Sequence, residues 1–567
     1  MSTPETDLPK TDLPRTDMAR TDAPVPFNLA DLVRSAADTA GDKIAIVFRG
    51  HELSWAQIDQ RVNRLAAALR RADSGGQGSG GLGLVAGDRV AVQLGNVPEF
   101  VVAYFGALRA GLVVVPLNTG YTPAELRHIL GDVGARAFIT SAGGAETGAL
   151  LCAELELLEH LIVVDVASAP AGAVTFDALL DSSEDNRSAG DPASASDPAS
   201  TSQAPTGGED LAVVLYTSGT SGRPKGALLS HRALLANLDQ AGQIQPAVMT
   251  EQDVVLLVLP LFHIYGLNGA LGMVAKHSAT GVLVERFEPL ETLKVIRDRQ
   301  VTNVIGAPPM YVAWSMLPDI GDVFASVRLL VSGSAPLPAA VLGRVLEVTG
   351  QHVFEGYGLT ETAPVLTSTL MSEVAKPNSI GRAIPGVEVV LRDERGRPVL
   401  DGDPGELVVR GANLFSGYWP DGAGGPDADG WFATGDVAVL DGDGDLQLVD
   451  RRLEMVLVSG FNVYPREVEE VLASHPDLQE AAVLGIAHPY TGESVKALVV
   501  LCEGARLSAD DVIAFCARSL ARFKCPTTVE FVSELPHSVT GKVSKAQLRE
   551  SQQRENELRE SQLDDAL

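Results

Sequence analysis

Short apolar, β-branched runs alternate with helical stretches along most of the chain. Arg89–Leu94 predicts a strand, Pro98–Arg109 a helix, and Leu112–Pro116 the next strand. Strands separated by helices are typical of α/β proteins with largely parallel sheets. The same pattern predicts further strands at Arg136–Thr140, Leu211–Tyr216, Val254–Leu259, Thr302–Ile305 and Arg328–Ser332.

After about residue 385 the pattern changes to short strands separated by Asp/Gly turns. Val387–Arg392 and Glu406–Arg410 predict a small β-rich subdomain, and a compact α+β segment follows Asp450. We therefore expect an α/β protein in two parts. Residues 27–450 form a large N-terminal domain of several subdomains, with mostly parallel sheets plus the β-rich one. Residues 451–549 form a small, mobile α+β C-terminal domain.

Three segments have compositions that do not favour a packed core. Residues 1–26 repeat Thr-Asp every five residues with Pro, Lys or Arg between, and we expect a disordered tail. Residues 182–210 are rich in Ser, Ala, Pro, Gly and acids, which predicts a low-complexity surface loop. Residues 550–567 predict a charged tail.

Composition narrows the functional classes. The 567 residues are 45% hydrophobic and carry a formal net charge of −29, which argues against broad contact with nucleic acid or anionic membranes. The four cysteines have no metal-ligand spacing and fit a reducing compartment. No stretch of 18 apolar residues predicts a transmembrane helix, and no signal peptide begins the chain. We therefore expect a cytoplasmic protein without a transmembrane segment.

The most informative motif follows the apolar run at 211–215. Residues 216–226 read Tyr-Thr-Ser-Gly-Thr-Ser-Gly-Arg-Pro-Lys-Gly. Glycines let the backbone approach a ligand closely, free N–H groups form a nest for anionic oxygens, and Lys225 adds a point charge. The pattern predicts a polyphosphate-binding loop, although it is not a Walker A sequence because Pro224 precedes the lysine.

Three later segments add chemistry that suits a nucleotide. Residues 355–361 place Tyr357 at a glycine turn, where an aromatic face can meet a nucleobase, and then Glu361, which can bind Mg²⁺. Residues 431–436 place Asp436 at a predicted strand end, where a carboxylate can accept from ribose hydroxyls. Residues 536–542 set Lys542 on a glycine-containing loop.

These four segments, in this order, resemble the adenylate-forming superfamily of acyl-CoA synthetases, peptide-synthetase adenylation domains and luciferases. The resemblance runs from about Phe27 to Arg549. It is closest to the acyl- and aryl-CoA ligases through residues 259–266, Leu-Pro-Leu-Phe-His-Ile-Tyr-Gly, and residues 459–465, Ser-Gly-Phe-Asn-Val-Tyr-Pro.

The resemblance implies an enzyme that uses ATP, Mg²⁺ and coenzyme A, and it assigns roles to individual residues. Lys542, Thr360 and Glu361 would be catalytic: Lys542 bridges carboxylate and α-phosphate, Thr360 contacts the α-phosphate, and Glu361 binds the metal. The β- and γ-phosphates would be held by Thr217, Ser218, Gly219, Thr220, Ser221, Gly222 and Lys225. Adenine would be framed by Gly333, Ser334, Ala335, Glu355, Gly356 and the stacked Tyr357, and ribose held by Asp436 and Arg451.

The same resemblance implies a second half-reaction in which a thiol replaces AMP. The small domain would swivel about Asp450, and Ser459, Gly460 and Phe461 would lie at the CoA site. Family members often carry lysine two positions after the hinge arginine, where this chain has Leu453. Residues 536–542 also resemble a site for protein acetyltransferases, whose reaction would remove the charge of Lys542.

The expected acyl pocket is lined by His263, Gly266, Gly269, Met273, Gly306, Gly333 and Ala363. On a helix, Gly266, Gly269 and Met273 share a face through three- and four-residue spacing. That face either leaves room for a bulky acyl group or packs closely against a neighbour. We interpret His263 as a pocket-lining or gating residue in preference to a catalytic base.

No acidic residue stands early in this segment to bind an ammonium group, which disfavours an amino-acid substrate. We expect a medium- or long-chain fatty acid, with an aryl-propenoic acid as the alternative. Loading of a carrier protein instead of CoA also stays open. A non-catalytic nucleotide-binding module is disfavoured because both Glu361 and Lys542 are present.

Overall fold

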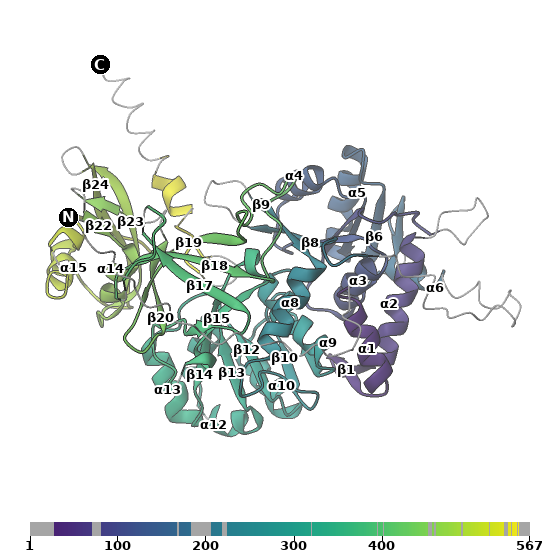
Figure 1. The fold of residues 1–567 in the computed structure, drawn as a ribbon, viewed down its shortest axis with the longest axis horizontal. Helices are drawn as coiled ribbons and strands as arrows, with labels where there is room; N and C mark the ends of the chain where they lie inside the picture. The colour runs from purple at the N-terminus through teal and green to yellow at the C-terminus, as the bar shows by residue number, and fades with distance from the viewer. Residues whose placement is uncertain are drawn as a thin grey trace, which may run out of the picture.

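The structure is a computed structural model that describes residues 28–70, 81–166, 169–182, 206–217, 224–318, 320–372, 374–393, 395–400, 402–451, 456–458, 461–488, 492–520, 522–537, 542–545, 547–552 and 554. Two large sheets with their helices form the main body (Figure 1). The β-rich sheet lies between this body and the C-terminal α+β part (Figure 1). The expected tail at 1–26, most of the 182–210 loop and most of the 550–567 tail lie outside the described residues.

The first large sheet has seven strands in the order β7-β6-β5-β3-β4-β8-β9. Its pairs are parallel except for the β8–β9 hairpin. The strands are β3 (Arg89–Gln93), β4 (Val113–Pro116), β5 (Ala137–Ser141), β6 (His160–Val164), β7 (Ala173–Thr175), β8 (Leu211–Thr217) and β9 (Lys225–Ser230). Its connecting helices are α3 (Pro98–Arg109), α4 (Pro123–Val133), α5 (Ala145–Glu154) and α6 (Phe176–Asp181).

The second large sheet has nine strands in the order β16-β15-β14-β13-β12-β10-β11-β1-β2. The run from β14 to β1 is parallel, with antiparallel strands at both edges. The strands are β1 (Ile44–Phe48), β2 (His51–Ser54), β10 (Val254–Leu257), β11 (Thr280–Leu283), β12 (Asn303–Gly306), β13 (Leu329–Ser332), β14 (Val353–Gly358), β15 (Val365–Ser368) and β16 (Arg382–Ala383). The α-helices around it are α1 (Asp31–Ala40), α2 (Trp55–Arg70), α8 (His231–Gly242), α9 (Met273–Lys276), α10 (Pro289–Asp298), α11 (Pro308–Ser315), α12 (Ile320–Val323) and α13 (Ala339–Thr349).

Two smaller sheets complete the fold. The antiparallel β-rich sheet contains β17 (Val387–Arg392), β18 (Gly405–Gly411), β19 (Trp431–Leu440) and β20 (Leu446–Arg451). The C-terminal sheet contains β21 (Val456–Val458), β22 (Phe461–Val463), β23 (Leu478–His488), β24 (Gly492–Leu501) and β25 (Thr528–Phe531), with α14 (Pro465–Ala473) and α15 (Ala509–Cys516). Residue 450 therefore lies near the end of β20, just before the chain passes from the β-rich sheet to the C-terminal sheet.

The two large sheets share one hydrophobic core. Every residue of helix α3 except Glu99 is buried, including Arg109, because apolar residues occupy nearly all of its faces. Burial of the Arg109 guanidinium is compensated by Asp59, whose carboxylate lies 2.6 Å from Nη1. The C-terminal sheet has separate apolar clusters of its own, as expected for a second domain.

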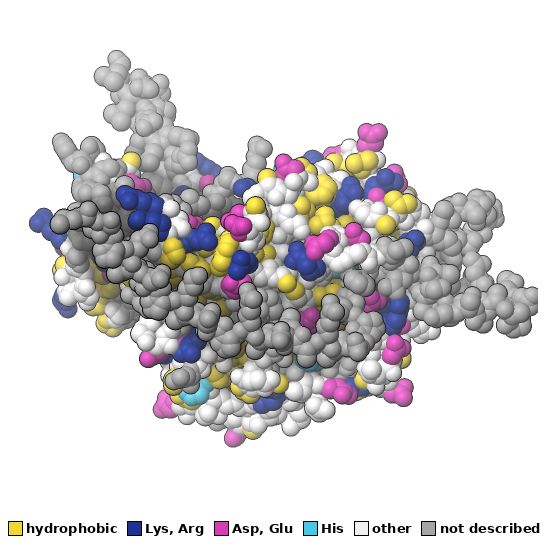
Figure 2. All heavy atoms as spheres, in the orientation of Figure 1, with side chains coloured by type: hydrophobic (Ala, Val, Ile, Leu, Met, Phe, Trp, Pro, Cys, Tyr) yellow, Lys and Arg dark blue, Asp and Glu magenta, His cyan; other side chains and the backbone are white. Residues whose placement is uncertain are grey.

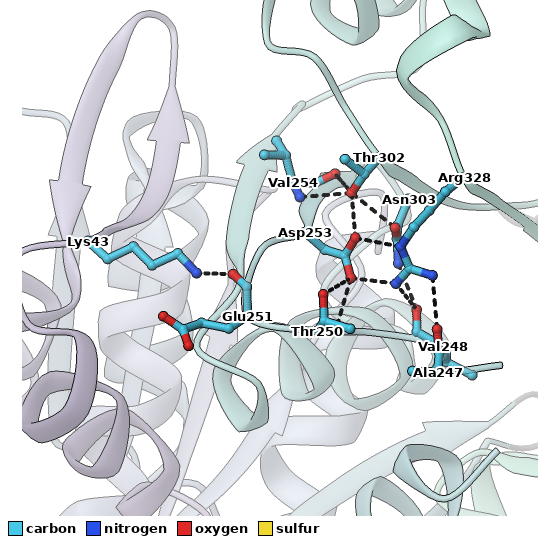
Figure 3. A network of polar contacts seen from close by, with 10 residues as sticks. All are labelled: Lys43, Ala247, Val248, Thr250, Glu251, Asp253, Val254, Thr302, Asn303 and Arg328. Atoms are coloured by element: carbon cyan, nitrogen blue, oxygen red, sulfur yellow. Dashed lines mark hydrogen bonds and ion pairs between the residues drawn. The ribbon is translucent and has the colours of Figure 1, made fainter. Parts of the chain in front are cut away.

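A polar network joins the amino ends of three parallel strands (Figure 3). Asp253, which precedes β10, is buried and accepts hydrogen bonds from Arg328 Nε at 2.7 Å and Thr302 Oγ1 at 2.8 Å. Arg328 precedes β13 and Thr302 precedes β12, so a single carboxylate fixes the relative positions of three neighbouring strands. The opposite ends of these strands are left for the site.

The expected α/β class with mostly parallel sheets, a β-rich subdomain and a small α+β part is confirmed. The ten strands and helices named from sequence match the structure to within two residues at each end. On the face drawn in Figure 2, basic and acidic side chains are interspersed and do not form one basic field. Among the described helices, none has both the length and the apolar character that a membrane span requires.

Candidate active site

Several of the predicted site residues that the structure describes lie where parallel strands end. The carboxyl ends of β12, β13 and β14 carry Gly306, Gly333 and Glu361, and the end of β8 in the other sheet carries Thr217. In α/β proteins this edge is where ligands bind, because helix N-termini and loops converge there. These strand ends come from segments up to 144 residues apart in sequence.

The described residues of the phosphate-loop motif belong to the two strands of the β8–β9 hairpin. Thr217 is the last residue of β8 and pairs with Lys225, the first residue of β9. Ser218, Gly219, Thr220, Ser221 and Gly222 lie outside the described residues, so their contacts stay a prediction. The Lys225 ammonium lies 5.3 Å from the centroid of the Tyr418 ring, within cation–π range.

Glu361 lies in a short 3₁₀ turn, η5 (Thr360–Thr362), just beyond β14. Its carboxylate oxygen Oε1 accepts a hydrogen bond from the Tyr418 hydroxyl at 2.6 Å. The Glu361 backbone carbonyl accepts a second one from Phe415 N at 2.9 Å. Thr360 is buried beside it. The structure therefore brings the predicted metal ligand and the predicted phosphate-binding lysine to the same tyrosine.

Buried asparagines hold the turn that follows Glu361. Asn268 Nδ2 donates to the Ala363 carbonyl at 2.7 Å, and Asn413 Nδ2 donates to the Thr362 carbonyl at 2.8 Å. Ala363 adopts a left-handed conformation, with φ +65°. Such a conformation costs free energy in a non-glycine residue and persists where surrounding contacts fix it.

Tyr357 and Asp436 meet directly, although both sit in elements other than those expected. The Tyr357 hydroxyl donates to Asp436 Oδ2 at 2.5 Å, and both residues are buried. Tyr357 lies within strand β14 and not at a glycine turn, and Asp436 lies inside β19 and not at its end. Gly435, with φ +77°, and a register shift at Val437 let β19 continue past Asp436. The side chain of Arg451 is not among those described.

The loop after β13 is joined to β14 through Glu355. Glu355 Oε1 accepts a hydrogen bond from Leu337 N at 2.9 Å. Burial raises the pKa of Glu355 to about 7, which the Leu337 N–H and the charge of Arg466 partly oppose. Ser334 in the same loop has φ +74°, and Ala335 is half-buried. Gly356 has room for a side chain, since a Cβ there would meet only Thr367 O at 3.5 Å.

Tyr265, which the sequence did not single out, lies against two of the glycines expected to line the acyl pocket. A Cβ on Gly333 would lie 2.9 Å from Tyr265 Cε1, and one on Gly269 would lie 3.0 Å from Tyr265 Cδ2. The Tyr265 ring therefore occupies the space that two glycines leave open. Its hydroxyl is buried and has no hydrogen-bond partner within the described part of the chain. At Gly306 a Cβ would meet Tyr311 and Met310 at 3.1 and 3.3 Å.

The α-helical face proposed for Gly266, Gly269 and Met273 is wrong. Residues Tyr265–Gly272 form a π-helix, whose wider turn changes which side chains align. Gly266 is buried against backbone, because a Cβ would lie 2.3 Å from Pro260 O, so this glycine serves close packing. Met273 begins α9 and packs in the main hydrophobic cluster.

His263 lies immediately before this π-helix and near the C-terminal lysine. Burial, and next the positive charge of Lys542, lower the pKa of His263 to about 4. The imidazole is therefore neutral at physiological pH, and its Nδ1 accepts from Tyr265 N at 3.3 Å. Lys542 is exposed and comes from the C-terminal part, so the structure brings the two parts together at this site.

Sequence reasoning missed Tyr418, Trp419 and Asp132. Trp419 Nε1 donates to the Asp132 carbonyl at 3.0 Å, and the Tyr216 hydroxyl donates to the Asp132 carboxylate. These contacts support the stem of the phosphate hairpin from α4. The sequence signal for Tyr418 and Trp419 was Gly-Tyr-Trp-Pro at 417–420. It is a turn sequence that holds two aromatic residues outside any apolar periodicity.

Comparison with known proteins identifies the family. The AMP-binding enzyme family matches residues 32–419, and the AMP-binding enzyme C-terminal domain matches residues 467–542. A long-chain-fatty-acid–CoA ligase from Yersinia pestis is 34% identical over 93% of this chain and 94% of that protein. A feruloyl-CoA synthase from Amycolatopsis sp is 36% identical over 89% and 95%. ATP-bound MatB from Rhodopseudomonas palustris superposes with a TM-score of 0.80 at 32% identity, covering 93% and 99%.

The chain therefore belongs to the AMP-binding enzyme family, as its motifs predicted. It is an AMP-forming acid–thiol ligase, and ATP and CoA are the co-substrates that fit this family.

Proposed function

We propose that this ligase activates a medium- or long-chain fatty acid with ATP and transfers the acyl group to CoA. The main support is a set of contacts among predicted residues: Tyr418 contacts both Lys225 and Glu361, Tyr357 donates to Asp436, and the charge of Lys542 acts on His263. Relatives named as long-chain-fatty-acid–CoA ligases cover most of the chain. Because ATP and CoA are cytoplasmic metabolites, we place the enzyme in the cytoplasm.

In the first half-reaction a carboxylate oxygen attacks the α-phosphorus, and the bond to the β-phosphate oxygen breaks to release pyrophosphate. Two anions must approach, so the rate depends on positioning and on neutralising charge. In this proposal Lys542 lies between the two reacting groups, Thr360 donates to the α-phosphate, and Lys225 with the phosphate loop holds the β- and γ-phosphates.

Tyr357 and Asp436 would hold the nucleoside. Their 2.5 Å hydrogen bond fixes the carboxylate, which can then accept from a ribose hydroxyl, while Arg451 would donate to a ribose oxygen. Adenine would lie against Tyr357, Gly356 and the Gly333–Ala335 loop. Glu355 would act indirectly, because its hydrogen bond to Leu337 N sets the position of that loop.

Mg²⁺ fits the residues present, since one carboxylate is the usual protein contribution to a metal held by nucleotide phosphates. Glu361 is the half-buried carboxylate at this edge, and one of its oxygens already accepts from Tyr418. When bound, the ion would withdraw negative charge from the phosphates.

In the second half-reaction the CoA sulfur attacks the acyl-AMP carbonyl carbon, the bond to the phosphate oxygen breaks, and the thiol proton leaves to solvent. Lys542 would obstruct that approach, so we propose that residues 451–549 swivel about Asp450. Ser459, Gly460 and Phe461 would then line the CoA site. Ser459, Gly460 and the side chains of Asp450 and Phe461 lie outside the described set.

An aryl-propenoic acid is the second candidate substrate, favoured by Tyr265. The Tyr265 ring, which lies between Gly269 and Gly333, would form one wall of a flat slot. The buried Tyr265 hydroxyl could donate to a substituent on the aromatic ring of the substrate. A relative named feruloyl-CoA synthase is 36% identical. Carrier-protein loading remains an alternative for the acceptor.

An acid panel decides among these proposals. Saturated acids from two to eighteen carbons, ferulate and 4-coumarate are assayed for AMP release with and without CoA, and with a phosphopantetheinylated carrier protein. We expect CoA-dependent AMP release to be greatest with medium- or long-chain acids. Efficient turnover of acetate alone would contradict a large pocket, and preference for ferulate would select the second candidate.

We also propose that Lys542 is a substrate for a protein acetyltransferase. It is exposed, and acetylation would remove the charge that adenylation requires. Mass spectrometry of the protein isolated from its own cells under several growth conditions should find a fraction acetylated at Lys542. A lysine unmodified under every condition would contradict this.

A further inference from the structure

The segment of residues 415–419 runs beside strand β9, which begins at Lys225. Ser416 N donates to the Leu228 carbonyl at 2.8 Å, and Leu228 N donates to the Gly417 carbonyl at 2.9 Å. Trp419 N then donates to the Gly226 carbonyl at 2.8 Å. This backbone pairing fixes the segment to the hairpin stem one residue away from Lys225.

The same segment is also fixed to the turn that carries Glu361. Phe415 N donates to the Glu361 carbonyl at 2.9 Å, and the Tyr418 hydroxyl donates to Glu361 Oε1 at 2.6 Å. The face of the same Tyr418 ring lies 5.3 Å from the Lys225 ammonium. One side chain thus contacts a carboxylate at its edge and an ammonium at its face.

The arrangement has a clear electrostatic consequence. Lys225 and Glu361 carry opposite charges, and a flexible lysine close to a carboxylate would pair with it directly. The tyrosine lies between them and gives each charge a different partner, so that no ion pair joins the two in the described residues. Both groups are thereby kept available for phosphate oxygens and a divalent cation.

We propose that Tyr418 is a positioning residue for metal–nucleotide binding, acting by keeping Lys225 and Glu361 apart and oriented. This inference rests on the proposed function, because it takes both residues as contacts of a nucleoside triphosphate with its metal. In this proposal Tyr418 itself touches neither the triphosphate nor the metal. Removal of its hydroxyl should weaken binding of the metal–triphosphate complex and leave binding of metal-free AMP unchanged.

The test uses the full-length protein and the Tyr418→Phe variant, which keeps the ring. Binding of α,β-methylene-ATP is measured by calorimetry with Mn²⁺ and without metal, and bound Mn²⁺ is counted by electron paramagnetic resonance. We expect affinity for the Mn²⁺ complex to fall about 10-fold, at the low end for a hydrogen bond to a charged group because the site is half-exposed. Metal-free AMP binding should stay within twofold.

Two controls separate positioning from general loss of structure. Tyr121→Phe removes the hydroxyl of another half-buried tyrosine, which lies just before α4, and should change neither affinity. Tyr418→His, which keeps a ring and a donor, should recover part of the loss. If Tyr418→Phe does not fold, the histidine variant is compared with Tyr418→Leu instead, and the order wild type, histidine, leucine is expected.

A double-mutant cycle with Glu361→Gln tests the proposed route. If Tyr418 acts through Glu361, adding Tyr418→Phe to Glu361→Gln should cause no further loss of Mn²⁺-complex affinity. Wild-type affinity in Tyr418→Phe, equal loss of AMP binding, or additive effects in the cycle would each overturn the inference. Failure of the wild-type protein to bind the triphosphate at all would instead overturn the proposed function.

Discussion

At the scale of single residues, Glu355 is a carboxyl group held where its charge is unfavourable. Burial raises its pKa to about 7, above the ordinary 4.5. The folded state therefore binds a proton that the unfolded chain releases, and stability from this group falls as pH rises from about 4.5 to 7. Above pH 7 the Glu355 carboxyl is ionised in the folded state as well, and its burial then costs the most stability.

Glu355→Gln should therefore raise the free energy of unfolding by about 1–3 kcal/mol at pH 8, and much less at pH 5. Glutamine keeps an acceptor for Leu337 N while carrying no charge. Thermal unfolding of the nucleotide-free protein at both pH values measures the effect. Glu347→Gln on the exposed face of α13 is the control and should show no such pH dependence. A larger gain at pH 5 than at pH 8 would contradict the prediction.

Two glycines of the π-helix should respond differently to the same added methyl group. In Gly266→Ala the new Cβ would meet backbone oxygen at 2.3 Å, so we expect a destabilisation of about 1–3 kcal/mol. In Gly269→Ala the nearest atoms belong to the Tyr265 ring at 3.0 Å, which can move. We expect that variant to fold normally and to lose turnover of bulky acids.

Melting temperature and the acid panel together check this pair. Normal stability with altered acid preference in Gly266→Ala would show that Gly266 lines the pocket after all. An unchanged acid profile in Gly269→Ala would remove Gly269 from the pocket.

At the scale of elements, the two ends of the parallel sheet have separate tasks. The Asp253 network joins the amino ends of β10, β12 and β13, while the proposed substrates lie at the carboxyl ends (Figure 3). Burial works to raise the pKa of Asp253, but hydrogen bonds from Arg328, Thr302 and Thr250 outweigh it and the pKa is lowered. The ionised carboxylate is thus a stabilising part of the fold.

Asp253→Ala should destabilise the protein by about 3 kcal/mol, since it leaves Arg328 without its buried partner. At temperatures where the variant is folded, kcat/KM should stay within about twofold, since the network is remote from the chemistry. Urea unfolding and steady-state assays measure the two quantities, with the exposed Asp298→Asn as control. A large loss of kcat/KM without loss of stability would contradict this division.

Sequence predicted regular elements well and irregular ones poorly. Strand β3 follows from its apolar run, because a buried strand needs only local pattern. The π-helix at 265–272 carries no distinct pattern, since its hydrogen bonding depends on packing around Gly266. Asp436 seemed to end a strand because Gly435 precedes it, yet a bulge lets β19 continue.

The candidate site shows the same limit. Loops with glycine, hydroxyls and lysine were found because their composition is unusual, and the resemblance supplied their roles. Tyr418 and Tyr265 were missed because their importance comes from tertiary neighbours that lie far away in sequence. Tyr418, for example, contacts Glu361 across 57 residues.

At the scale of the whole molecule, the proposed mechanism requires different arrangements of the two domains in its two half-reactions. Lys542→Ala should abolish acyl-AMP formation, measured by pyrophosphate release, because the lysine neutralises charge only in the first step. Transfer of a supplied acyl-adenylate to CoA should be nearly unchanged. Equal loss of both half-reactions would contradict the two-arrangement proposal and indicate a general structural role.

His263 offers a direct report of domain position, independent of turnover. Burial, then the Lys542 ammonium, lower its pKa to about 4, so folded-state stability from this imidazole is present above pH 6.5 and lost as pH falls towards 4. Lys542→Gln removes the charge but not the burial, so the pKa of His263 should rise while staying below 6.5. NMR of the labelled imidazole measures it. His231, whose pKa is also lowered to about 4 mainly by burial, is the internal control and should not change.

If the C-terminal domain swivels, a bound acyl-adenylate analogue with CoA should raise the His263 pKa in the wild-type protein as well. A His263 pKa unchanged by both treatments would mean that Lys542 does not approach the acyl pocket in solution.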